Sequence, residues 1–95
     1  MSYFVVAYEV PAERAEAVER ALLDIDPQAE RYLGNVWVMH GDTERSLGHQ
    51  VEQILHAANG ERAFLTEVDE AQWRRRALAG QGANWPPLRP GEQLH

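Results

Sequence analysis

Glu9 is the residue of this chain that is best placed to do chemistry. It lies near the end of the apolar run YFVVAYEV, residues 3–10, just before Pro11, which favours the start of a helix. A carboxylate at the carboxyl end of an early strand can hold a hard cation such as Mg²⁺ or Mn²⁺. If a second copy brought another Glu9 close, the paired carboxylates could bind the cation and activate water for phosphodiester hydrolysis. The plainer interpretation, which we favour, is a solvated surface acid beside a helix N-terminus.

Trp73, Arg74, Arg75 and Arg76 form the one basic cluster of the sequence. Arginine beside an aromatic ring can stack on bases and bind phosphates, so these residues are candidates for nucleic-acid binding. Successive helical residues point about 100° apart, however, so the cluster does not make one flat patch. We favour a solvated helix whose arginines pair with the acidic body of the protein and whose Trp73 anchors it to the core.

Three histidines, His40, His49 and His56, are weaker candidates for a metal site. No two of them have the i, i+4 spacing that most readily chelates a metal on a helix, and zinc usually needs three or four ligands. We expect all three to be solvated. His40 and Trp37 are nevertheless the visible candidates for a polar pocket in which an enzyme could act on a small molecule.

The strand that carries Glu9 has apolar side chains on both of its faces. Two of them share one face and three share the other: Phe4 and Val6, against Tyr3, Val5 and Ala7. Such a strand is typical of the centre of a sheet. Apolar residues then recur at helical spacing up to Asp26-Pro27, which predicts a helix that ends there.

Two strands joined by a tight turn should follow this helix. We expect them at residues 28–33 and 36–40, because Gly34-Asn35 between strand-like runs indicates a hairpin. The sequence of Val36, Trp37 and Val38 is rich in strand formers, which makes the second strand the stronger prediction.

The second half of the chain continues with another helix and strand. The helix should run from an N-cap at Asp42 or Thr43 to a stop at Asn59-Gly60. A last strand should span residues 62–68, and an acidic cap should then open a short helix over residues 70–78.

These elements give the order βαββαβ, the split-βαβ arrangement of ferredoxin-like folds. We therefore predict an α+β domain at residues 1–79, in which a four-stranded antiparallel sheet has two helices on one face, plus the short C-terminal helix. A Gly- and Pro-rich tail should occupy residues 80–95. Its Trp85-Pro86-Pro87-Leu88 segment is costly to leave in water, so we expect it to dock on its own subunit or on another.

The second face of the predicted sheet has no cover within the chain. Tyr3, Val5 and Trp37 are the apolar residues that we expect to need hiding there. A second copy of the same sheet is the simplest partner, so the pattern favours a homodimer through the open sheet face.

Composition narrows the classes of function. The 95 residues carry a net charge of −6, which argues against coating nucleic acid by bulk attraction but leaves a local basic patch possible. The absence of cysteine removes disulfides and thiolate metal sites. No apolar run of about 18 residues is present, so we expect no membrane span. The first apolar run lacks a basic segment before it, so we expect a strand instead of a signal peptide and a cytoplasmic location.

The segments YFVVAYEV, NVWVMHG and ERAFLTEV resemble the small ferredoxin-like subunit of the CRISPR adaptation machinery, and more closely its short SinR-like relatives. Those chains begin with a strand of type Y-x-V-x-Y-D, carry a Trp near the start of the hairpin strand, and follow the fourth strand with an acidic turn and a Trp. The matching segments here are Tyr3 to Glu9, Val36-Trp37-Val38, and Val68-Asp69 with Trp73. The resemblance spans about residues 2–79.

This resemblance implies a homodimer and, in some members, metal-dependent nuclease activity or a nucleic-acid-binding scaffold role. Glu9 matches the family's aspartate at the end of the first strand and is one methylene longer. Our leading hypothesis is a small homodimeric binding or assembly module of the SinR-like type. The alternatives are a Mg²⁺- or Mn²⁺-dependent nuclease that uses paired Glu9, and a dimeric ferredoxin-like enzyme that acts on a small molecule.

Overall fold

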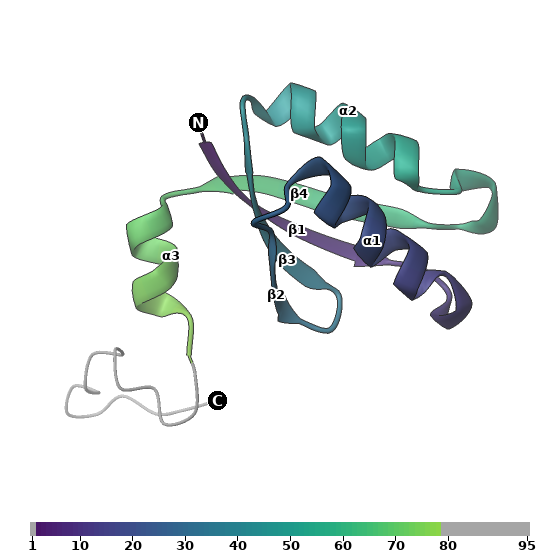
Figure 1. Cartoon of the computed structure of the whole chain (residues 1–95), viewed down its shortest axis with the longest axis horizontal. Helices are drawn as coiled ribbons and strands as arrows, with labels where there is room; N and C mark the ends of the chain where they lie inside the picture. Colours follow the sequence, from purple (N-terminus) through teal and green to yellow (C-terminus); the bar gives the residue numbers. More distant parts are fainter. Residues whose placement is uncertain (1, 79–95) are drawn as a thin grey trace, which may run out of the picture.

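The fold is a four-stranded antiparallel sheet with two long helices on one face, in strand order β2-β3-β1-β4 (Figure 1). The computed structural model describes residues 2–78. Their elements are β1 (Ser2–Glu9), the 3-10 turn η1 (Ala12–Arg14), α1 (Ala15–Ile25), β2 (Glu30–Leu33), β3 (Val36–Gly41), α2 (Glu44–Ile54), the 3-10 turn η2 (Ala57–Asn59), β4 (Arg62–Val68) and α3 (Glu70–Arg76). This order and topology confirm the predicted α+β, ferredoxin-like βαββαβ fold.

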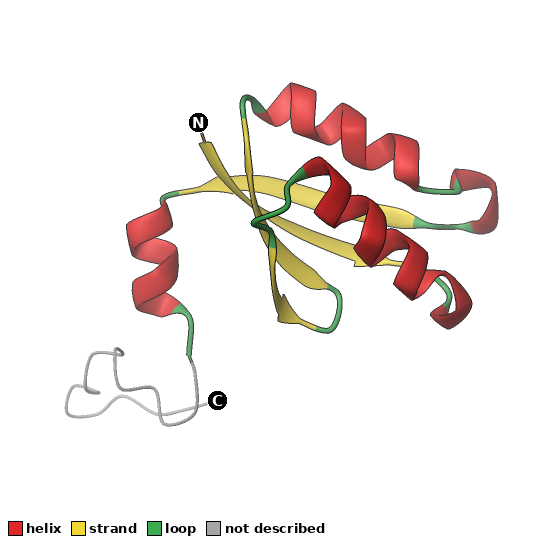
Figure 2. Cartoon of the chain, viewed as in Figure 1, coloured by secondary structure: helices red, strands yellow, loops and turns green. Residues whose placement is uncertain are grey.

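The short third helix lies apart from the other two. Figure 2 shows α1 and α2 running over the same side of the strands, while α3 follows β4 at the opposite end of the molecule. The predicted tail, with its Trp85-Pro86-Pro87-Leu88 segment, lies outside the described residues. None of the helices within residues 2–78 is long and apolar enough to cross a bilayer.

The core fills the space between the sheet and the two long helices. Phe4 and Val6 of β1 are fully buried there, as the alternation along the first strand predicts. They pair across the sheet with Met39 and Trp37 of β3. The helices contribute apolar side chains to the same core: Val18, Leu22, Leu47 and Val51.

The expectation that Trp37 lies on the open face is wrong. Trp37 pairs directly with Val6, and directly paired residues of antiparallel strands point to the same face. Trp37 therefore belongs to the helix-covered core and is 5% exposed. The error came from the register, which fixes the face that each residue of a strand occupies.

The hairpin turn at Gly34-Asn35 forms where the sequence predicts it, and it also fixes the end of β1. The side-chain Nδ2 of Asn35 donates to the backbone carbonyl of Tyr8 at 2.9 Å, and the backbone N–H of Tyr8 donates to the backbone carbonyl of Asn35 at 3.0 Å. These two bonds hold the turn beside the end of the strand that carries Glu9.

The prediction that α2 continues to Asn59-Gly60 is wrong, because the helix ends at Ile54. A side chain from η1 interrupts it: Nη2 of Arg14 donates to the Ile54 carbonyl at 2.8 Å. Gly60, with φ of 79°, instead closes the separate turn η2 before β4. At its other end α2 begins as expected, with the Thr43 hydroxyl accepting from the Ser46 N–H at 3.0 Å.

Candidate functional site

The sheet face opposite α1 and α2, which we call the open face, gathers the residues most relevant to function. Strand alternation and register place on it one set of side chains from all four strands: Tyr3, Val5, Ala7, Glu9, Glu30, Leu33, Val36, Val38, His40, Arg62, Phe64, Thr66 and Val68. Part of this face is covered by α3 and part of it is not.

The covered part lies around Tyr3, which is 5% exposed although no long helix reaches it. The guanidinium of Arg74 lies over the Tyr3 ring, 5.9 Å from its centre. Trp73 meets the ring of Tyr32 edge to face at 5.2 Å. Burial raises the pKa of the Tyr3 hydroxyl, so this side chain stays neutral around pH 7. The short helix therefore supplies a lid of aromatic and cationic side chains over one half of the open face.

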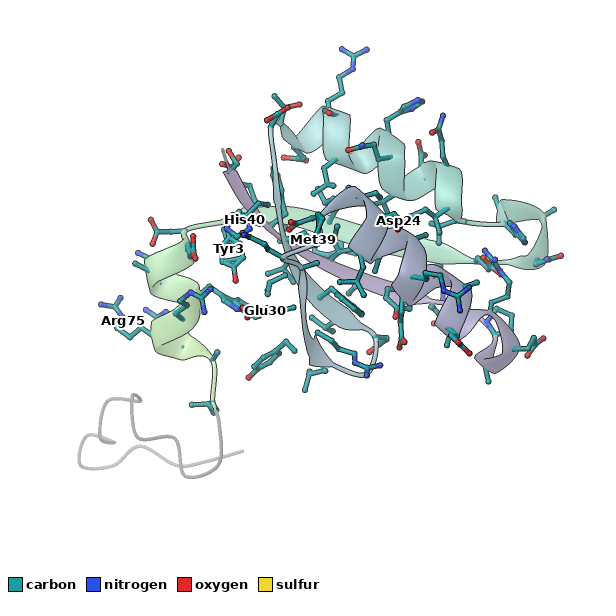
Figure 3. The ribbon with its side chains drawn as sticks, in the orientation of Figure 1. Tyr3, Asp24, Glu30, Met39, His40 and Arg75 are labelled. Atoms are coloured by element: carbon teal, nitrogen blue, oxygen red, sulfur yellow. The ribbon has the colours of Figure 1, made fainter. Side chains whose placement is uncertain are left out.

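His40 lies at the centre of the polar contacts beneath α3. Its ring stacks on Tyr3, with 5.0 Å between ring centres and 8° between ring planes. Its Nδ1 is 3.6 Å from Oδ2 of Asp26, and its Nε2 is 3.6 Å from Oε1 of Glu70. Figure 3 shows Tyr3 and His40 side by side between the sheet and α3. Both ring nitrogens thus face carboxylates at a distance longer than a hydrogen bond, and Nδ1 is buried with no hydrogen-bond partner among the described residues. A protonated ring is attracted to both carboxylates by charge.

Asp26 is held rigidly in this arrangement. Its Oδ2 accepts the backbone N–H of His40 at 2.8 Å, and its Oδ1 accepts the backbone N–H of Gln28 at 3.0 Å. The side chain is nearly buried, at 11% exposed. From the sequence, Asp26 is predicted only to end the first helix. Its contact with His40 could not be predicted, because it depends on how β3 packs against the end of α1.

The predicted basic cluster is divided by the helix that carries it. Trp73 and Arg74 face the sheet, and Arg74 pairs with Glu70 at 3.1 Å and with Glu30 at 4.0 Å. The hydrogen bond to Glu70 raises the pKa of Arg74. Arg75 points away from the sheet on the far side of α3 (Figure 3). Arg76, at the end of α3, is exposed. The four residues therefore do not make one surface, and Arg74 is already bound to carboxylates of its own chain.

The uncovered half of the open face is apolar. It includes five side chains from three adjacent strands, four of them apolar and one a threonine: Val5, Ala7, Val36, Phe64 and Thr66. Phe64 is 64% exposed, the highest value among the exposed large hydrophobic residues of the described part of the chain. A phenylalanine in the middle of a strand is costly to leave in water, so this half is a candidate contact surface.

Glu9 lies at one end of this uncovered half and is 72% exposed. Its cross-strand neighbour is Arg62, whose Nη2 is 3.6 Å from the Glu9 carboxylate. Within residues 2–78, no three His, Cys, Asp or Glu side chains are grouped so that they could hold a metal ion. Within one chain, the described neighbour of the Glu9 carboxylate is therefore a cation, Arg62.

His40 and Trp37 do not form the small-molecule pocket that the sequence allowed. The two residues are three apart in β3, so the alternation of the strand sends their side chains to opposite faces. Trp37 is in the core, whereas His40 is on the open face beneath α3.

A separate groove lies between α2 and the edge strand β4. It encloses about 760 Å³ over an apolar floor that includes Val51, Leu55 and Leu65. His49 lies on its rim and contacts Gln53 at 3.2 Å. His56 lies beyond the end of α2 and is also exposed, so neither histidine joins His40.

Arg14 and Glu61 form an ion pair that the sequence does not predict. Arg14 and Glu61 make two parallel hydrogen bonds of 3.0 Å, and the Glu61 side chain is completely buried. The hydrogen bond from Arg14, with a further one from the His56 N–H, lowers the pKa of Glu61 to about 2. The two residues are 47 positions apart, and no local pattern signals such a pair.

The chain matches no protein-family model and no curated protein. The fold and the open face therefore carry the argument about function.

Proposed function

We propose that this protein is a small homodimeric binding or assembly module of the SinR-like type, in which two copies pair through the uncovered half of the open face. The observation that carries the proposal is Phe64, which is 64% exposed in the middle of β4 and lies beside partly exposed Val5, Ala7 and Val36. A second copy of this face would bury the apolar side chains of both.

The charges beside this surface favour a second copy as the partner. Glu9 and Arg62 lie next to each other at its end, with opposite charges and mostly exposed side chains. A two-fold axis through the uncovered half presents the same pair from the partner, so each carboxylate can face an arginine. The apolar part supplies the affinity, and the charged pair at its rim supplies orientation.

The first prediction is that Phe64→Ser weakens the dimer at least tenfold. Large aromatic residues at the centre of an interface typically cost about 2 kcal/mol or more when truncated. Sedimentation or light scattering over a concentration series gives the dissociation constant. The matched control is Leu23→Ser, because Leu23 is 40% exposed on α1, which covers the other face. A wild-type protein that is monomeric at micromolar concentration contradicts the proposal, as does a Phe64→Ser variant that pairs as tightly as the wild type.

A metal-dependent nuclease with paired Glu9 is the second proposal. It is favoured by the position of Glu9 on the open face, at the end of the surface through which two copies are proposed to pair. The neighbouring Arg62 counts against it, since a cation already occupies one side of the carboxylate.

The second prediction tests this nuclease. If it is right, Mg²⁺ or Mn²⁺ supports cleavage of RNA or DNA by the wild type, Glu9→Gln abolishes the cleavage, and His49→Ala retains it. His49 is a fair control because it is exposed on α2, away from the open face. Cleavage that survives Glu9→Gln, or that is absent in the wild type with either metal, removes the nuclease proposal.

A further inference from the structure

The attachment of α3 to the open face is small and combines aromatic contacts with ion pairs. The helix has seven residues and none of them is buried, in contrast to α1 and α2 with two buried residues each. Its end is held by the Tyr32 hydroxyl, which accepts the Leu78 N–H at 3.1 Å. A short helix with no buried residue of its own opens more readily than the core does.

The imidazole of His40 is the side chain beneath α3 that can gain or lose a positive charge near neutral pH. The partner on one side, Asp26, is fixed by two backbone N–H groups that do not belong to α3. The partner on the other side, Glu70, is in the first turn of α3 and moves with it. A charge on the imidazole therefore draws the helix toward the sheet, and its loss removes that attraction.

Two other ionisable groups near His40, Arg74 and Tyr3, keep their charge state around neutral pH. Arg74 of α3 lies over Tyr3 and pairs with Glu70 and with Glu30 of β2, and arginine is always protonated. Tyr3 of β1 is buried and neutral. The carboxylates that face this cluster are those of Asp26, Glu30 and Glu70. Histidine is the side chain whose charge ordinarily changes between about pH 5 and pH 8.

We propose that α3 is a pH-sensitive cover on the open face, latched by His40 between Asp26 and Glu70. With His40 protonated the cover is closed, and with His40 neutral it opens more often. Opening uncovers Tyr3 and Val38, which are 5% and 4% exposed and lie beside the uncovered half. The cover thus regulates how much of the open face a partner can reach, and in this respect it rests on the proposed function.

The test is amide hydrogen exchange in residues 70–76 of the full-length protein, at about pH 5.5 and about pH 8. After correction for the intrinsic exchange rate, α3 should open about fivefold more often at the higher pH, as expected for partly exposed ion pairs. His40→Gln should remove this difference, while His49→Gln should retain it. An α3 that exchanges equally at both values in the wild type, or a difference that persists in His40→Gln, overturns the proposal.

Two further measurements keep the test decisive. If His40→Gln does not fold, as judged by exchange in β1, then Glu70→Gln removes the carboxylate on the moving helix and should reduce the pH difference; an unchanged difference overturns the latch. The association state is measured separately by light scattering. A dimer with a pH-insensitive α3 disproves only the cover, whereas a strict monomer with a pH-sensitive α3 disproves only the dimer.

Discussion

Arg14 and Glu61 join three segments of the chain at one buried point. Arg14 comes from η1, the carbonyl that it also binds belongs to the last residue of α2, and Glu61 directly precedes β4. The carboxylate of Glu61 further accepts the His56 N–H at 2.9 Å. An ion pair whose carboxylate is buried and hydrogen-bonded is costly to break from one side, because the remaining charge is left without its partner.

The prediction at this residue is that Glu61→Gln lowers the melting temperature at pH 7 by about 5 °C or more. The change keeps the size of the side chain but leaves the Arg14 guanidinium without its counter-ion. Thermal unfolding followed by circular dichroism measures the effect. Glu67→Gln is the matched control, since Glu67 is an exposed glutamate of β4 and should change the melting temperature little. An equal effect of the two substitutions would refute the role of the buried pair.

The same pair sets a dependence on pH. The pKa of Glu61 is about 2 in the folded protein, below the ordinary value of 4.5. A depressed pKa stabilises the folded state above the ordinary value, and this stabilisation is lost as the pH falls from about 4.5 toward about 2. The difference in stability between the wild type and Glu61→Gln should therefore be largest near neutral pH and shrink in acid.

The position of a single residue can be predicted from sequence where strand alternation alone decides it. It cannot be predicted where a residue far away in the sequence is the neighbour. The alternation along β1 correctly placed Phe4 and Val6 in the core and Glu9 at the end of the strand. The neighbour of Glu9, Arg62, follows from the register of β1 with β4, which pattern alone does not fix. The position of His40 next to Asp26 likewise depends on how β3 packs against the end of α1.

At the scale of elements, the end of α2 shows what local propensity leaves out. The sequence offers a glycine stop at Gly60, and that residue does adopt a left-handed conformation. The helix nevertheless stops at Ile54, because Arg14 takes its terminal carbonyl and Glu61 takes the next free N–H, that of His56. Arg14 and Glu61 therefore end α2 before the glycine stop at Gly60. They bind the Ile54 carbonyl and the His56 N–H, which a longer helix would use in its own hydrogen bonds.

The sequence correctly predicts that a short helix follows β4, but tertiary contacts decide which surface α3 covers. The Asp69 side chain accepts the Gln72 N–H at 2.8 Å, as an acidic cap should. A helix of this length is not stable alone in water, so it depends on the contacts of Trp73 and Arg74 with the sheet. Sequence could locate the helix, but the face of the sheet that it covers could only be seen in the structure.

At the scale of the whole molecule, the order of elements was sufficient to predict the architecture. The order βαββαβ with short connections permits few topologies, and the sheet order β2-β3-β1-β4 is the one expected of it. The asymmetry between the two halves of the open face was not predictable. It arises because α3 folds back over Tyr3 and leaves Phe64 exposed, so that only part of the face is available to a second copy.

The net charge of −6 leads to the last prediction, which concerns the dimer as a whole. Two copies with the same negative charge repel each other, and salt screens this repulsion. Raising the NaCl concentration from about 0.02 M to about 0.3 M shortens the Debye length from roughly 20 Å to roughly 6 Å. The dissociation constant of the dimer should therefore fall about threefold, as sedimentation equilibrium can measure. Neutralising exposed acids outside the sheet, in a Glu13→Gln, Asp24→Asn variant, should reduce the salt effect. A dissociation constant that instead rises with salt would show that charged pairs such as Glu9 with Arg62 hold the copies together more than the apolar surface around Phe64 does.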